Sequence, residues 1–457
     1  MANLTLDSAP ATNVGQVSLY RAIWRWHFFA GLLVIPFLLN LSITGSLYLF
    51  KDEINDTIFA YRNIVADGPR SLKPSEIVEN ATAAVPGTVV NYREPADSTH
   101  SALVTISSDA GNTLVFVDPH DGRILDHVAS NNEFNWVVKK IHSLEYFGTY
   151  ANHLVEIVGG FALMLVVTGL YLWWPRQRTG GVLSVRGTPS RRVFWRDTHA
   201  VTGAVAGLFI FFLAATGMPW SGYWGANANA WLTTNGYGYP AELFDAVPAS
   251  ALSTHHVVEQ PGWIVENAPV PESDTHAGHA MAQPIGLDAA VDIARNAGMA
   301  AGFDVAIPGD RNGVYTASIF PEDLSKERTI HIDQYSGEPL VDISYDQFPT
   351  VGKLIEWGIN VHQGQEWGRI NQILMLVTCL AIILMCMSAI VMWWKRRPSG
   401  SLGVPPMPPR KSVYIGLWTI AAIFGLAFPM SGIAILVMVL VDQVVLRLAP
   451  PLRRAFA

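Results

Sequence analysis

The sequence predicts a mainly α-helical membrane protein, a tandem-repeat bundle of transmembrane helices that carries two α+β domains outside the bilayer. The first observation is composition. Half of the 457 residues are apolar, only 15% are charged, and the mean hydropathy is +0.26. This composition is typical of an integral membrane protein. The second observation is an internal repeat, which divides the chain into two copies of one helix–domain–helix unit.

Four histidines recur in matching sequence contexts and define this repeat. His27 and His199 are each followed by a glycine after four residues and by a Thr-Gly pair after seventeen. His142 and His362 each precede a glycine by six residues and a Trp-Trp pair by thirty-one. Each copy of the repeat therefore brings two histidines to the membrane.

Four apolar runs are long enough to cross a hydrocarbon core of about 30 Å. They are residues 28–50, 154–174, 200–220 and 370–394. The short loops after the second and fourth runs are rich in Arg and Lys, which keeps such loops in the cytoplasm. The N-terminus is then inside, and the two long connections are outside. The first run is too long for a cleavable signal peptide, so we expect it to remain as an anchor.

These features divide the chain into segments. We predict a disordered cytoplasmic N-terminus (1–20), a first span (21–50), a first outer domain (51–152), a second span (153–175), a cytoplasmic basic loop (176–198), a third span (199–221), a second outer domain (222–368), a fourth span (369–394), a second basic loop (395–412), a C-terminal apolar segment (413–446) and a tail (447–457). The C-terminal segment is interrupted around Pro429 and precedes a basic tail, so we interpret it as a hairpin of two short helices. One long tilted helix is the alternative.

Both outer segments show the pattern of a small α+β domain. Each has an amphipathic helix, at 74–85 and 287–298, followed by alternating strands and by a turn in which Asp and Gly lie four residues apart. The strands are predicted at 102–107, 113–117, 315–320 and 329–332. The second segment also carries an insertion at about 225–283, rich in Gly, Ala, Pro and His, which we interpret as a loop or lid.

Motifs at the ends of the spans are similar to those of one known family. Trp24-Arg25-Trp26-His27 precedes the first span, and Phe194-Trp195-Arg196-Asp197-Thr198-His199 precedes the third. Thr168-Gly169-Leu170-Tyr171-Leu172-Trp173-Trp174-Pro175-Arg176 and Val391-Met392-Trp393-Trp394-Lys395-Arg396 end the second and the fourth. In these motifs the chain resembles the PepSY-associated transmembrane proteins, a bacterial group linked to iron uptake that includes ferric-siderophore reductases.

The resemblance implies a location, a fold and an activity. The protein would lie in the bacterial inner membrane with its N-terminus in the cytoplasm, and its two α+β domains would be PepSY-like and periplasmic. The best-understood members of the family are di-haem b proteins that move electrons across this membrane. The implied function is electron transfer from an external donor, a quinol or a soluble flavoprotein, to a ferric siderophore or another ferric chelate.

The four histidines are the candidate haem ligands. His27 and His199 lie at the cytoplasmic ends of their spans, whereas His142 and His362 lie just before the outward ends of the second and fourth spans. Ionisable residues at membrane spans are functional candidates. A pseudo-twofold axis along the membrane normal would bring each pair face to face, and two opposed imidazoles hold the iron of a bis-histidine haem b. The alternative is interfacial histidines that cap helices or bind headgroups.

Two glycines and a fifth histidine are further candidates. Gly31 and Gly203 lie one turn beyond His27 and His199, where a glycine lets a flat porphyrin approach the backbone. His153 is a rival or additional outer ligand, although the second copy has Ile373 at the corresponding position.

Other classes of function stay open. In the insertion, His276, His279 and Met281 suit copper or another soft-to-borderline metal, and a flexible polar loop is the alternative. The protein could therefore be a periplasmic metal-binding accessory, or a non-redox membrane-anchored module that binds or regulates a periplasmic partner. The sequence has no Gly-x-Gly-x-x-Gly or Walker motif, so a reductase of this kind takes its electrons from outside the chain. We expect no nucleic-acid partner.

Overall fold

The computed structural model describes residues 14–68, 71–175, 180–245, 247–258, 261–273, 283–405 and 411–441. The chain divides into two compact units. The helical unit comprises Met1–Ile43, Ser143–Trp224 and Leu376–Ala457, and the sheet unit comprises Thr44–His142 and Gly225–Met375, as far as each is described.

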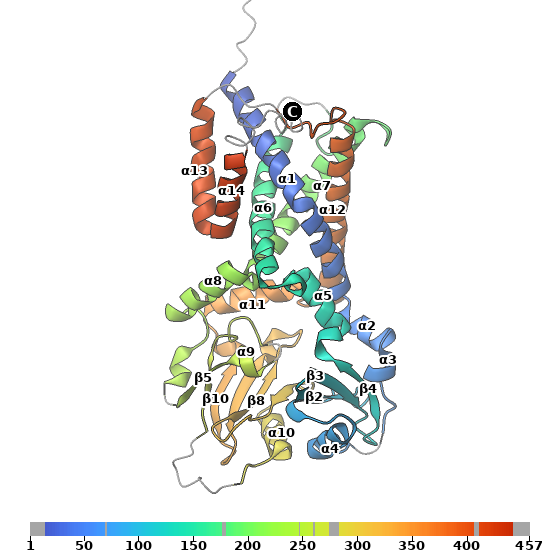
Figure 1. Ribbon diagram of the computed structural model, residues 1–457, viewed down its shortest axis with the longest axis vertical. Coiled ribbons are helices and arrows are strands. Elements are labelled where there is room, and N and C mark those ends of the chain that lie inside the picture. Colours follow the sequence, from blue (N-terminus) through green and yellow to red (C-terminus); the bar gives the residue numbers. More distant parts are fainter. Residues whose placement is uncertain are drawn as a thin grey trace, which may run out of the picture. The chain divides into compact units, whose positions relative to one another are not determined.

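Within the described residues, four helices are long and apolar enough to cross a membrane. They are α1 (Val14–Tyr48), α6 (Thr149–Trp173), α7 (Arg192–Gly217) and α12 (Arg369–Trp394), coloured from blue through green to orange in Figure 1. A long helix occurs at each of the four places where the sequence predicts a span. Helices of this kind satisfy their backbone hydrogen bonds internally, as the hydrocarbon region of a bilayer requires.

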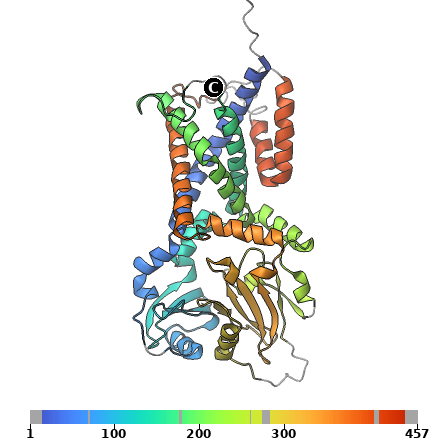
Figure 2. The same ribbon diagram turned by 180° about the vertical axis from the view of Figure 1, so that it is seen from behind.

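The long helices share an apolar core. Ala206 and Ile210 of α7 form a buried cluster with Ile382 and Cys386 of α12, and Leu38 of α1 packs against it. Figure 2 shows these helices from behind. The buried Cys386 belongs to this cluster as a small apolar residue. The core therefore joins helices from both copies of the repeat.

The C-terminal apolar segment contains two helices. α13 (Lys411–Ala427) is followed by α14 (Pro429–Leu440), which has Pro in its first turn, where the missing N–H breaks no helical hydrogen bond. A Cβ added to Gly425 would lie 3.0 Å from the Cα of Gly432, so glycine permits the close approach of the two helices. Within the described residues 411–441, the chain forms two helices that meet at Phe428.

The sheet unit is built around one antiparallel sheet, which has eight strands within the described residues. The strand order is β10-β9-β8-β7-β1-β2-β3-β4. The strands are β1 (Thr88–Arg93), β2 (Ala102–Ser108), β3 (Gly111–Val117), β4 (Ile124–Ala129), β7 (Asp304–Ala306), β8 (Val314–Ile319), β9 (Arg328–Asp333) and β10 (Pro339–Ser344). Helices α4 (Pro74–Ala84) and α10 (Leu287–Asn296) pack on one face of the sheet and against each other.

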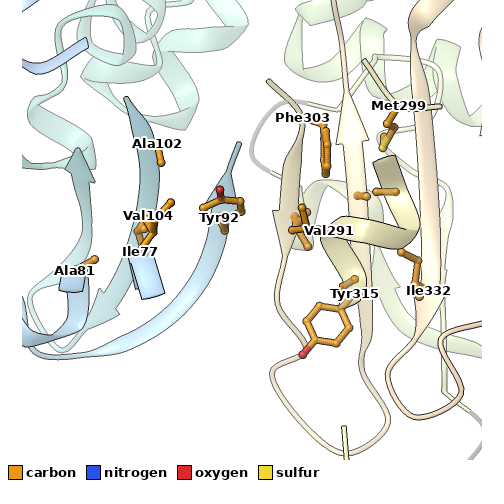
Figure 3. Packing of buried hydrophobic residues seen from close by; sticks show 14 of the residues in the cluster. Ile77, Ala81, Tyr92, Ala102, Val104, Val291, Met299, Phe303, Tyr315 and Ile332 are labelled. Atoms are coloured by element: carbon orange, nitrogen blue, oxygen red, sulfur yellow. The ribbon is translucent and has the colours of Figure 1, made fainter. Parts of the chain in front are cut away.

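The sequence predicts two separate α+β domains, and the structure corrects this expectation in one respect, because the strands of both belong to a single sheet. β1 pairs with β7, which places Tyr92 opposite Val305. Val104 from the first half and Phe303 from the second belong to the same buried cluster, part of which is drawn in Figure 3. Each half alone would expose an edge strand with unpaired backbone groups, and the β1–β7 pairing removes both of these edges.

Polar contacts reinforce the junction between the two halves of the sheet unit. Asp304 of β7 accepts hydrogen bonds from Asn91 Nδ2 at 2.7 Å and from Arg93 Nε at 3.0 Å. Asp288 in the first turn of α10 accepts hydrogen bonds from the backbone N–H and the hydroxyl of Ser75 in α4, at 2.8 and 2.7 Å. These contacts join equivalent elements of the repeat, so the two halves have one continuous core.

The insertion at 225–283 contains regular structure in its described part. Most of helix α8 (Gly222–Thr234), helix α9 (Thr254–Val257) and strands β5 (Ala249–Ser253) and β6 (Pro269–Pro271) lie within it. Trp263 is only 1% exposed, and its carbonyl accepts a hydrogen bond from Asn229 Nδ2 at 2.7 Å. Of the expected loop or lid, the loop without regular structure is therefore corrected for the described part, where large apolar side chains pack within the sheet unit.

Candidate functional site

His27 and His199 lie side by side in the helical unit. His27 is on α1 and His199 is on α7, and their ring centroids are 6.4 Å apart with the ring planes at 87°. The two residues occupy equivalent positions in the two copies of the repeat. Metal–imidazole bonds of about 2.0–2.1 Å each fit between two rings at this separation. The pair therefore has the spacing of two ligands on one metal centre.

The Nδ1 atom of each ring is held by a neighbouring helix. His27 Nδ1 lies 2.8 Å from Thr168 Oγ1 on α6, and this hydroxyl donates its own proton to the Met164 carbonyl at 2.8 Å. His27 Nδ1–H is therefore the donor to Thr168. His199 Nδ1 lies 3.1 Å from the Met385 carbonyl on α12, which can only accept. This network assigns the proton of both rings to Nδ1 and leaves Nε2 with its lone pair, the form that binds a metal.

A second repeat relationship supports this arrangement. Thr168 and Ser388 are corresponding residues, since each precedes a Trp-Trp pair by five positions. Ser388 Oγ lies 3.4 Å from His199 Nδ1 and donates to the Met385 carbonyl at 2.9 Å. These supporting residues were not predicted from the sequence. The sequence indicates only that the two hydroxyl residues occupy corresponding positions. The packing of the helices shows which atoms their hydroxyl groups contact.

The predicted glycines have different surroundings. A Cβ added to Gly31 would meet no described atom within 4 Å, so there is open space beside this glycine. A Cβ added to Gly203 would lie 3.2 Å from Cε of Met385, which occupies that side of α7. Gly169, which was not predicted, lies against His27, because its Cβ would be 3.3 Å from Cε1 of that ring. Gly31 thus has room for a flat ligand, whereas Gly169 lets the His27 ring approach α6.

The second predicted histidine pair lies in the sheet unit. His142 is the last residue of α5 (Phe134–His142), and His362 is the last residue of α11 (Thr350–His362). His142 Nδ1 lies 2.9 Å from the Thr44 hydroxyl, so a threonine holds this ring as well. The ligand role of this pair therefore stays a prediction.

His153 lies near the start of α6, beside Gly222 of α8. A Cβ added to Gly222 would be 3.3 Å from His153 Nδ1, and this buried nitrogen has no hydrogen-bond partner among the described residues. Glu156, three residues further along α6, is fully buried, and its Oε2 accepts a hydrogen bond from the Trp224 N–H at 3.0 Å. His153 therefore remains a candidate ligand without an assigned role.

The predicted metal ligands of the insertion, His276, His279 and Met281, lie outside the described residues. Elsewhere, in the part of the chain that the structure describes, no group of three or more His, Cys, Asp or Glu side chains is arranged to hold a metal ion. The copper cluster therefore stays a prediction.

The sheet unit has an acidic cavity of about 450 Å³ next to the turn that follows α11. Glu322, Asp323 and Glu366 line it, together with Leu324, Ser325, Tyr345, Gln365 and Gly368. No Lys or Arg belongs to this lining as far as the chain is described. The volume lies within the range of about 300–1,000 Å³ that is usual for small-molecule sites. Its charge favours a cationic ligand over an anionic one.

Together, the long apolar helices and the neighbouring histidines define a class, that of multi-span membrane proteins with two histidines side by side in the helix bundle. The family model described as the PepSY-associated TM region matches residues 24–396, and the chain belongs to this family. The matched region contains His27, His142, His199 and His362. A comparison with curated proteins finds no match.

Proposed function

We propose that this protein is a di-haem b electron-transfer protein of the bacterial inner membrane. It moves electrons from the cytoplasmic side or the quinol pool to a periplasmic acceptor, and this acceptor is a ferric siderophore or another ferric chelate. The observation that carries the proposal is the His27–His199 pair. Two Nδ1-protonated imidazoles on facing helices are the arrangement that a six-coordinate haem iron needs.

The residues around the pair suit a haem. Thr168 and the Met385 carbonyl accept the Nδ1 protons, which fixes the orientation of both rings and makes their Nε2 atoms better donors. Ala30 and Val34, which follow His27 on α1, belong to a buried apolar cluster. When bound there, haem supplies one-electron redox chemistry, with a potential set by its axial ligands and its burial.

The acidic cavity of the sheet unit supports the proposed acceptor side. Glu322, Asp323 and Glu366 give its wall a negative charge that attracts cationic chelates. Gain of one electron converts ferric to ferrous iron, which hard oxygen ligands hold less tightly. The chain would therefore release iron by electron transfer, with no bond formed to the protein.

A reduced-minus-oxidised optical spectrum of the purified full-length protein, with its haem-to-protein ratio, tests the proposal. We expect b-type bands and two haems per chain. His127→Ala, which alters an exposed histidine of β4, should leave the spectrum unchanged and serves as the matched control. A protein that stays colourless after haem supplementation would contradict the proposal and favour a sheet unit that binds a periplasmic partner.

A further inference from the structure

Two glutamates of the sheet unit are buried close together. Glu327, immediately before β9, is 4% exposed, and Glu356 on α11 is 0% exposed. A methyl group placed on Gly262 would collide with Glu327 Oε1 and would lie 3.3 Å from Glu356 Oε1. The two carboxyl groups therefore border the same small space, which the Gly262 segment of the insertion covers.

Few hydrogen-bond donors reach these carboxyl groups. Glu356 Oε1 accepts a hydrogen bond from the Ile264 N–H at 2.7 Å. The Oε2 atoms of Glu327 and Glu356 receive no hydrogen bond from any described residue. Asn360, one turn further along α11, is also fully buried, and its Oδ1 has no donor within the same described set. Buried acceptors of this kind need a donor, and a proton on one carboxyl group would supply it.

The surroundings favour such a proton. Burial raises the pKa of Glu356 to about 8, and the Glu266 carboxylate adds to this effect. Burial and the charge of Glu356 raise the pKa of Glu327 well above its ordinary value. Burial also raises the pKa of Glu266 to about 7, against the opposing charge of Lys139. The charges of Glu327 and Glu356 also act on Tyr345, which in addition interacts with Glu366, Asp346 and Lys353. Because water is excluded from this space, two negatively charged carboxylates there would repel each other strongly.

We propose that Glu327 and Glu356 hold one proton between them and form a proton-binding site of the sheet unit. Asn360 lies one turn from Glu356 on α11, and its Nδ2 donates to Glu366 Oε2 at 2.6 Å, a residue that lines the acidic cavity. The cavity is the route by which the proton exchanges with solvent. The site belongs to the second copy of the repeat, since the first copy has Asn112 and Trp136 at the corresponding positions.

The role of the site rests on the proposed function. Glu356 precedes His362 by six residues on α11, which corresponds to about 9 Å along the helix axis. An electron that arrives at the His142–His362 side adds one negative charge, which strengthens proton binding at the glutamate pair. The pair then takes one proton from solvent and releases it when the electron passes to the ferric acceptor. One electron and one proton enter, and one of each leaves.

Infrared spectroscopy of the full-length protein tests the proton site directly, without requiring activity. At neutral pH we expect a C=O band of a buried neutral carboxyl group, which disappears as the wild-type protein is made alkaline. Glu327→Gln and Glu356→Gln should each remove the part of the band that titrates at the highest pH, leaving the contribution of Glu266, whereas Glu338→Gln, at an exposed glutamate, should retain the full band. A wild-type protein without the band, or a highest-pH part that survives both substitutions, would overturn the proposal. If one variant fails to fold, the wild-type titration together with the other variant decides the matter.

Redox-induced difference spectra test the link to electron transfer. Reduction of the wild-type protein should shift the disappearance of the band to higher pH, and the shift should be absent in Glu356→Gln. If the protein contains haem and the pH at which the band disappears does not change on reduction, the link to electron transfer is overturned. A protein that has the titratable band but binds no haem would overturn the proposed function while supporting the proton site, so the two failures are distinguishable.

Discussion

Thr168 holds His27 from the neighbouring helix, because the His27 Nδ1–H donates to Thr168 Oγ1 at 2.8 Å while Thr168 donates to the Met164 carbonyl at 2.8 Å. This sequence of two hydrogen bonds determines which ring nitrogen carries the proton. The Met385 carbonyl likewise accepts the Nδ1 proton of His199. The helix bundle therefore sets both rings in a ligand-competent form, as second-layer hydrogen bonds commonly do in metal sites.

Replacement of either histidine of the helical unit should remove one haem. His27→Ala or His199→Ala takes away one of the two proposed axial ligands, so we expect half of the haem absorbance to be lost and the second haem to stay. Haem quantification and low-temperature difference spectra measure this. His127→Ala, at an exposed histidine of β4, is the matched control and should keep both haems. If both His27→Ala and His199→Ala retain two haems, these residues are excluded as ligands of the inner haem.

Thr168→Val should weaken haem binding without removing a ligand. The substitution keeps the side-chain shape but removes the acceptor for His27 Nδ1–H, and loss of such a partner lowers affinity by about 10- to 100-fold in metal sites. Ser388→Ala should have a smaller effect, because the Met385 carbonyl still accepts the His199 proton at 3.1 Å. Haem titration of the apoprotein compares the two variants. Equal effects would indicate that Thr168 serves only packing.

Asp197→Ala should destabilise the helical unit. Asp197 is fully buried, and its carboxylate accepts hydrogen bonds from Arg186 Nε at 2.7 Å and Arg196 Nε at 3.0 Å. Removal of one partner from a buried ion pair costs about 3–5 kcal/mol, and we expect the lower end because both arginines are partly exposed. Thermal unfolding in detergent measures this.

The matched control for Asp197 is Asp292→Ala. Asp292 and Arg295 form an exposed ion pair at 3.2 Å on α10, and such surface pairs contribute less than about 1 kcal/mol. A loss of stability as large in this control as in Asp197→Ala would mean that burial of the Asp197 pair has no special effect.

The sheet unit should become less stable as the pH rises. The folded-state pKa of Glu356, about 8, is above its ordinary value of 4.5. Between these values the folded state binds more protons than the unfolded state, so the favourable contribution present below pH 4.5 is lost progressively up to about pH 8. Urea unfolding midpoints measured across this window should fall. Glu356→Gln should flatten the dependence, and a midpoint that rises with pH would contradict the assignment.

The acidic cavity should select acceptors by charge. Reduced protein should be re-oxidised faster by a cationic ferric chelate than by an anionic chelate of similar potential, because the Glu322, Asp323 and Glu366 side chains attract positive charge. Glu322→Gln should reduce this preference, and added salt should reduce it further. Stopped-flow spectroscopy of the haem bands provides the rates. A preference for the anionic chelate would indicate that the acceptor binds at a site other than the acidic cavity.

Several features of the protein could be predicted from local patterns in its sequence. The four long apolar helices occur where uninterrupted apolar runs were found, and the family resemblance read from the Trp-rich motifs is confirmed by the family match. Repeat spacing also related His27 to His199, which the structure places with ring centroids 6.4 Å apart. Each of these inferences needs only residue type and separation along the chain.

Other features required knowledge of contacts between distant segments. The β1–β7 pairing joins two domains that the sequence pattern treats as separate, because strand alternation reveals which face is buried but not which edge finds a partner. The buried Glu327–Glu356 pair was also missed. One residue lies beside β9 and the other on α11, and they meet only in the folded structure, where Gly262 and Ile264 of the insertion lie against them.

By itself, the sequence determined a membrane protein of the PepSY-associated family and four histidines in matching sequence contexts, because hydrophobic run length and residue spacing are properties of the chain alone. The tertiary structure decided which atoms these residues present to one another. Helix rotation and approach direct the Thr168 hydroxyl and the Met385 carbonyl to Nδ1 of the two rings, and they leave Nε2 for a ligand. A hydrogen-bond partner depends on direction as well as distance, and neither exists before the helices pack.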